Sequence, residues 1–158
     1  MMIEIATRGS RDLGPRVGTW VLLAVLAGPG CVEVDGGAVE VGWDLRYPDG
    51  RRTDDQDRFI DCQRARIGAM ALSLRPTAGG PDPCEAEDRC RFACSHLGSG
   101  TTPFVIPEAE YAMELEVLDL EGRSLGSADG IVTPGPVVRQ VRTGRIASLS
   151  VNLIIVDR

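Results

Sequence analysis

The sequence predicts an all-β protein, a single antiparallel β-sandwich of about seven to eight strands that follows an N-terminal signal segment. Three observations carry this prediction. Short segments alternate apolar and polar residues, glycine and proline separate these segments, and no long amphipathic helix occurs. Antiparallel pairing is expected because the connections are too short for helical crossovers between parallel strands.

The clearest strand is predicted over residues 38–47, where apolar residues at odd positions from Val39 to Tyr47 alternate with polar or small ones. In the last strand, over 146–156, the odd-numbered residues from Ala147 to Ile155 are expected to share the buried face. The same reasoning, with turn residues as boundaries, predicts the remaining strands at 67–74, 89–95, 104–106, 111–118, 123–127 and 137–141.

Residues 1–30 have the order of a secretory signal peptide. Arginines at 8, 11 and 16 precede an apolar run at 17–27, which the small-residue segment 28–30 follows. Cys31 comes next, and this arrangement resembles the lipobox of bacterial lipoproteins, which implies that Cys31 is lipidated and becomes the mature N-terminus. The alternatives are cleavage that leaves Cys31 as an ordinary thiol, and a membrane span, for which an eleven-residue run falls short of about 20 residues.

The domain organisation follows from this boundary. We predict a lipoprotein-type signal peptide at 1–30, a short tether at 31–37 and a β-sandwich domain at 38–158. The expected location is the cell envelope, outside the cytoplasm, with acylated Cys31 in the lipid membrane. Val32 replaces the aspartate that retains some lipoproteins at the inner membrane, which favours the outer membrane.

The cysteine count agrees with an oxidising compartment. If Cys31 carries lipid, four cysteines remain, which suits two disulfides. Cys90 and Cys94 on one extended strand would lie about 13 Å apart, too far to pair with each other. Two pairings remain, Cys62–Cys94 with Cys84–Cys90, or Cys62–Cys90 with Cys84–Cys94. We favour the first, because it closes one small acidic loop and clips a long loop to the core.

Charge argues against nucleic acid as a partner. The chain carries 17 basic residues, all arginine, against 23 acidic ones, and its net charge is −6. Neither a basic stripe nor a basic cluster is present, so the electrostatic footprint of nucleic-acid binding is missing.

A resemblance adds to this reading. The segments Val39–Leu45, Phe92–Cys94 and Phe104–Pro107, followed by Tyr111, are similar to those of uncharacterised bacterial lipoproteins with one Ig-like or transthyretin-like β-sandwich. The stretch from Phe104 to Gly122 also resembles the core hairpin of carboxypeptidase-regulatory-like domains. The resemblance implies a fold and a location at a membrane, and it implies no activity.

Few residues are candidates for metal binding or catalysis. Asp54, Asp55 and Asp57 are weak candidates for binding Ca²⁺, and a solvated polar loop is the favoured interpretation because EF-hand spacing is missing. Ser95 and His96 are neighbours, and adjacent strand residues point to opposite faces, so they do not form a simple nucleophile–base pair. We predict no catalytic residue, metal or cofactor.

The sequence therefore predicts a membrane-anchored lipoprotein whose domain is a non-catalytic binding or scaffold module. Its partner would be an envelope protein or an extracellular polymer. Two alternatives stay open: an envelope hydrolase that uses the acidic loop and His96, and a purely structural envelope component.

Overall fold

The computed structural model describes residues 34–85 and 88–157, so the predicted signal peptide and Cys31 lie outside the described residues. These residues form a β-sandwich, which confirms the predicted fold class. Two 3₁₀ helices, η1 (Asp88–Cys90) and η2 (Ser127–Asp129), interrupt the strands. The strands are β1 (Ala38–Arg46), β2 (Ala69–Pro76), β3 (Arg91–Ala93), β4 (Leu97–Thr101), β5 (Ala109–Leu118), β6 (Ser124–Leu125), β7 (Ile131–Val132), β8 (Val137–Val141) and β9 (Ile146–Val156).

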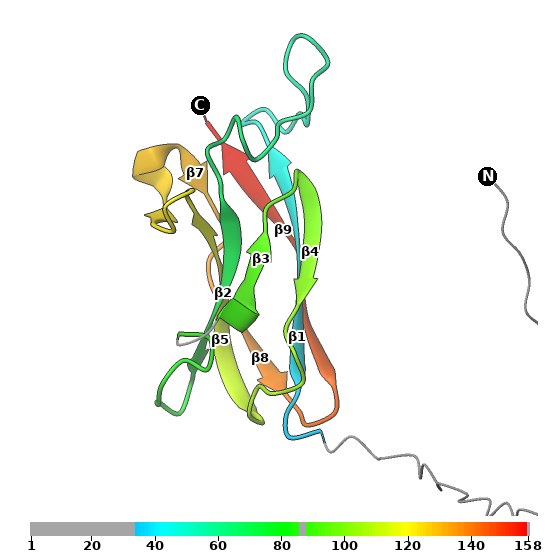
Figure 1. Cartoon of the computed structure of the whole chain (residues 1–158), viewed down its shortest axis with the longest axis vertical. Helices are drawn as coiled ribbons and strands as arrows, with labels where there is room; N and C mark the ends of the chain where they lie inside the picture. Colours follow the sequence, from blue (N-terminus) through cyan, green and yellow to red (C-terminus); the bar gives the residue numbers. More distant parts are fainter. Residues whose placement is uncertain (1–33, 86–87, 158) are drawn as a thin grey trace, which may run out of the picture. The chain divides into compact units, whose positions relative to one another are not determined.

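Two sheets make up the sandwich (Figure 1). The four-stranded sheet has the order β4-β1-β9-β7. The five-stranded sheet has the order β3-β2-β5-β6, and β8 also pairs with β5, next to the start of that strand. Nothing in the described part of the chain forms a helix long and apolar enough to cross a membrane.

One strand pair departs from the antiparallel expectation. β1 and β9, the first and last strands, run parallel, with Ala38 opposite Ile146 and Arg46 opposite Ile155. The other strand pairs of the described sheets are antiparallel. The reasoning from short connections holds only for strands that follow one another, whereas the whole of the domain lies between β1 and β9 and provides a long enough connection.

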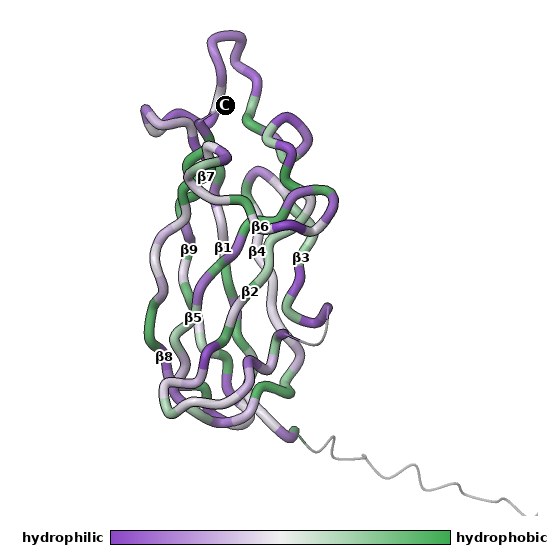
Figure 2. The backbone as a smooth tube through the Cα atoms, turned by 90° about the vertical axis from the view of Figure 1, so that its left-hand side faces the viewer, coloured by the Kyte–Doolittle hydropathy of each residue, from purple (hydrophilic) through white to green (hydrophobic). Residues whose placement is uncertain are grey.

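The core fills the space between the two sheets. β1 contributes Val39, Val41, Trp43 and Leu45, as its alternation predicts. Figure 2 shows apolar and hydrophilic residues interspersed along the strands, and mostly hydrophilic residues in the loops at the upper end. The facing sheet contributes the buried side chains Met70, Leu72, Leu74, Tyr111, Met113, Leu115 and Val117.

β4 was not predicted because its sequence, Leu-Gly-Ser-Gly-Thr, has only one β-branched residue and no aromatic residue, the types typical of strands. Its two glycines leave room for aromatic rings. A Cβ atom on Gly98 would lie 2.5 Å from Cζ2 of Trp43, and one on Gly100 would overlap the ring of Phe92. Trp43 and Phe92 are themselves stacked, with ring centroids 6.2 Å apart. The glycines are therefore a packing requirement of this strand.

Gly98→Ala is expected to lower the free energy of unfolding by about 1–3 kcal/mol, because the added methyl group overpacks the Trp43 contact. Gly126→Ala is the matched control, since a Cβ atom there meets no other atom within 4 Å. Urea denaturation of both variants measures the difference. Equal stability of the two variants would contradict the packing role of Gly98.

The predicted burial of β9 is wrong in its second half. Leu149 faces the core as expected, but Asn152, Ile154 and Val156 are buried where Val151, Leu153 and Ile155 were expected. The reason is a β-bulge, because the register of β1 and β9 shifts between Glu40 and Gly42 and Ser150 adopts a φ of 62°. An extra residue in one strand moves every later side chain to the other face.

Three smaller segments also differ from prediction. Residues 104–106 form no strand, and only Ile106 pairs there, in an isolated bridge to Gly37. The predicted strand over 89–95 shortens to β3 because η1 takes up Cys90. β7 is a two-residue strand that was not predicted from the sequence. Such short pairings come from contacts distant in sequence, which local alternation does not report.

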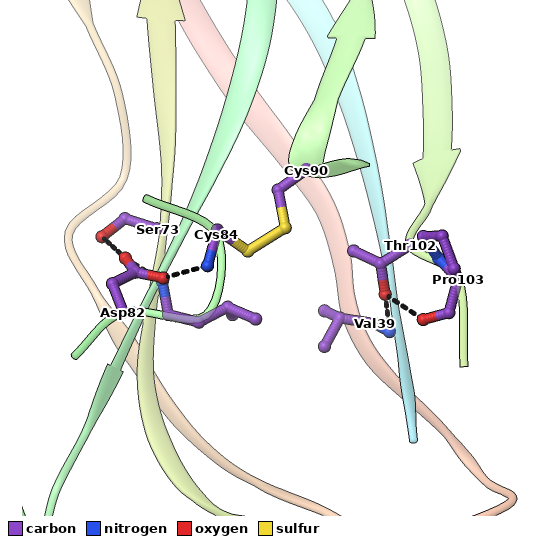
Figure 3. The surroundings of a disulfide bond; sticks show 8 residues. Val39, Ser73, Asp82, Cys84, Cys90, Thr102 and Pro103 are labelled. Carbon is purple, nitrogen blue, oxygen red and sulfur yellow. Dashed lines mark hydrogen bonds between the residues drawn. A yellow bond between two sulfur atoms is a disulfide. The ribbon is translucent and has the colours of Figure 1, made fainter. Parts of the chain in front are cut away.

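Two disulfides hold loops to the sandwich. They join Cys62 to Cys94 and Cys84 to Cys90, which is the pairing that we favoured. Figure 3 shows the second one, beside Asp82. The Asp82 carboxylate accepts hydrogen bonds from the Ser73 hydroxyl and from the backbone N–H groups of Leu74 and Cys84. Disulfides of this kind are typical of an oxidising, extracytoplasmic compartment.

Candidate binding surface

The outer face of the four-stranded sheet carries an exposed apolar strip. After the bulge, Val151, Leu153 and Ile155 of β9 point away from the core. In the same sheet, Leu97 of β4 lies opposite Asp44 of β1, and Val132 of β7 lies opposite Ile155. Contiguous exposed apolar side chains of this kind mark interaction sites more often than single ones do. We call this set the apolar strip: the exposed Leu97, Val132, Val151 and Leu153, and the half-buried Ile155.

Gly42 lies inside the strip, opposite Val151. A Cβ atom on Gly42 would approach Cγ2 of Val151 to 3.2 Å. The absence of a side chain at this position thus keeps the centre of the face shallow, so that another surface can approach the sheet there.

Asp44 lies in the same face, opposite both Leu97 and Leu153, and only 4% of its side chain is exposed. Its Oδ2 atom accepts from Arg46 and Arg52, with closest nitrogen–oxygen distances of 2.7 and 2.8 Å. Burial raises the pKa of Asp44, but the hydrogen bonds and charges of the two arginines outweigh it, so the pKa lies below its ordinary value. Arg52 belongs to the loop after β1, and the ion pair holds this loop against the sheet.

The same loop contains the aspartates that were candidates for binding Ca²⁺, and two of them are paired with arginines. Asp54 forms ion pairs with Arg58 and Arg64, and Asp55 pairs with Arg51. Asp57 is exposed, and its backbone has a φ of 55°. No three His, Cys, Asp or Glu side chains within the described ranges are placed to hold a metal ion. Asp54 and Asp55 therefore stabilise the loop by pairing with arginines.

Ser95 and His96 are not brought together as a catalytic pair. The Ser95 hydroxyl donates to the carbonyl of Leu97, and the His96 ring contacts Phe59 with 5.2 Å between ring centroids. The His96 carbonyl accepts the N–H of Leu45, which fixes this segment against the end of β1. Both residues thus make contacts that position the connection between β3 and β4.

A hollow of about 760 Å³ lies between the loop that precedes β2 and the turn after β5. Within it Arg123 forms ion pairs with Asp119, over 2.6 Å, and with Glu121. The Arg123 backbone N–H and then its guanidinium lower the pKa of Asp119. The lining residues are Arg64, Arg66, Asp119, Leu120, Glu121, Arg123, Leu125 and Asp129.

Acid is expected to destabilise the domain. The pKa of Asp54 is lowered, first by the hydrogen bond from Arg64, and those of Asp44 and Asp119 are also lowered. The unfolded chain, with aspartate pKa values of about 3.9, then binds protons first, so stability is complete above about pH 5 and falls as the pH drops below 4. Denaturation at a series of pH values measures this. Asp54→Asn should reduce the slope, whereas stability that rises on acidification would contradict the assignment.

Comparison with family models, with curated proteins and with solved structures found no match to this chain. The resemblance to lipoprotein and carboxypeptidase-regulatory-like sandwiches therefore stays a prediction. The apolar strip was not found from the sequence, because the bulge at Ser150 decides which face of β9 its residues occupy. The run Val151–Val156, apolar on both faces apart from Asn152, was the signal that could have indicated it.

Proposed function

We propose that this chain is a lipid-anchored lipoprotein of the cell envelope, outside the cytoplasm, whose β-sandwich is a non-catalytic binding or scaffold domain. The observation that carries the proposal is the pairing of the cysteines. All four that follow Cys31 are joined in two disulfides, and Cys31 stands directly after the signal-like segment. Because the other four cysteines pair among themselves, the Cys31 thiol is left available for lipidation, and the two disulfides suit an oxidising compartment.

The proposed location can be narrowed to one of the two membranes. Val32 follows Cys31, and the aspartate that retains some lipoproteins at the inner membrane is missing. This favours the outer membrane as the location of the acylated protein.

The apolar strip supports the proposal that the domain binds a partner. Val151, Leu153 and Leu97 are each more than half exposed, although apolar side chains of this size gain free energy when they leave water. The strip has no aromatic ring on which a sugar could stack, and its charged neighbour Asp44 is already paired with arginines. Among the partners that the sequence left open, an envelope protein with an apolar surface therefore fits better than an extracellular polymer.

A photoreactive amino acid at Leu153 tests this surface in living cells. Val138 on the outer face of β8 is the matched control, because its exposure of 50% is within one percentage point of the 51% of Leu153. Reproducible capture of one protein from position 153, saturable and absent from position 138, is the expected result. Capture at neither position would contradict the binding role and favour the purely structural one.

A further inference from the structure

The end of the sandwich at which the chain enters β1 carries a second group of exposed apolar side chains. Gly37 is bridged to Ile106, the Ala38 N–H donates to the carbonyl of Arg145, and the Gly144 N–H donates to that of Gly36. The turns 102–108 and 142–145 thus flank the entering chain, at the lower end of the sandwich in Figure 1. We call this region the tether end, and its exposed apolar side chains are Val34, Phe104, Val105 and Ile146.

Two arginines border these apolar side chains. Arg142 and Arg145 are exposed, and their guanidinium groups form no ion pair with any described residue. Of the carboxylates at this end, Glu108 accepts the N–H of Thr143, and Asp35 lies in the tether. Apolar side chains beside cations that are available for phosphate are the composition that binds the headgroup region of a bilayer.

The tether between Cys31 and this end of the sandwich is short. Val34 is three residues after Cys31, and an extended chain spans at most about 3.6 Å per residue, so they are separated by about 11 Å at most. The acyl chains of a lipidated Cys31 would lie in the hydrocarbon core, beneath a headgroup region several ångströms thick. The tether end is then within reach of the lipid surface, whereas the turn after β5 is at the opposite end of the strands.

We infer that the tether end docks on the phospholipid surface of the membrane that holds Cys31, with its apolar side chains in the headgroup region and Arg142 and Arg145 on lipid phosphates. This inference rests on the proposed lipid anchor. It fixes the orientation of the domain, with the strands rising from the membrane. The long loop after β1, with its arginine–aspartate pairs, then points away from the lipid.

Fluorescence quenching tests the docking. Phe104→Trp is introduced into the full chain, and the protein is purified from membranes and reconstituted into vesicles of phosphatidylcholine and phosphatidylglycerol with brominated acyl chains. Emission from the tryptophan introduced at position 104 is expected to shift to shorter wavelength and to be lost by contact with bromine. The unsubstituted protein supplies the background from buried Trp43. Ile146→Trp replaces Phe104→Trp if that variant does not fold.

Leu120→Trp, in the exposed turn at the opposite end, is the matched control and should keep its emission. Arg142→Glu with Arg145→Glu should remove most of the quenching at position 104. If the protein floats with the vesicles but position 104 is not quenched, or positions 104 and 120 are quenched alike, the docking is wrong and the anchor stands. If the protein does not float with the vesicles, the proposed anchor fails and the docking fails with it.

Discussion

Replacing both Cys62 and Cys94 by serine is expected to lower the free energy of unfolding by about 4 kcal/mol. The bond joins residues 32 positions apart, and in the chain-entropy model a link of this length restricts the unfolded chain by roughly that amount. It ties the long loop between β1 and β2 to the segment after β3. Guanidinium denaturation of the oxidised protein and of the double variant measures the loss.

The second disulfide is the control. Cys84 and Cys90 are only six positions apart, so replacing both by serine should cost about 2 kcal/mol in the same model. The order of the two double variants is the decisive result. A larger loss from the short link than from the long one would contradict the assigned roles.

Trp43→Ala is expected to cost about 3–5 kcal/mol, as for other large core side chains. Trp43 is 1% exposed, stacks on Phe92 and lies against Gly98. Its indole N–H donates to the carbonyl of Ser95 over 2.8 Å, so the side chain joins β1 to the connection between β3 and β4. Alanine leaves both a cavity and a carbonyl that has lost its donor.

Trp43→Phe separates these two contributions. It keeps much of the ring volume, and it removes part of the packing and the hydrogen bond, which contributes about 1 kcal/mol. Its loss of stability, measured by thermal and chemical denaturation, should therefore be well below that of alanine. Equal losses for phenylalanine and alanine would mean that the contact with Gly98 and Phe92 contributes little.

The sequence predicted best the elements whose burial follows one simple period. In β1 the odd-numbered residues from Val39 to Leu45 are buried as predicted, and so are those of β5 from Tyr111 to Val117. Elements that depend on a partner were missed. β4 is a strand because Gly98 and Gly100 accommodate the rings of Trp43 and Phe92, and no local propensity reports such a fit.

The candidate surface was harder to predict than the fold. Its residues come from β4, β7 and β9, and the direction of those in β9 depends on one bulged residue, Ser150, whose effect on register is not visible in the sequence. The loop carboxylates were recognisable as a group. Whether they would bind a cation or arginines depended on how the loop folds back on β1, which places Arg52 beside Asp44.

The central claim is that the protein is a disulfide-bonded lipoprotein anchored through Cys31. Its most direct test is the intact mass, with and without reduction, of protein taken from its native membrane. We expect the mass of a chain that begins at Cys31 plus a lipid, and a gain of two hydrogens for each of the two disulfides on reduction. An unmodified mass that includes residues 1–30, with free thiols, would contradict both the anchor and the compartment.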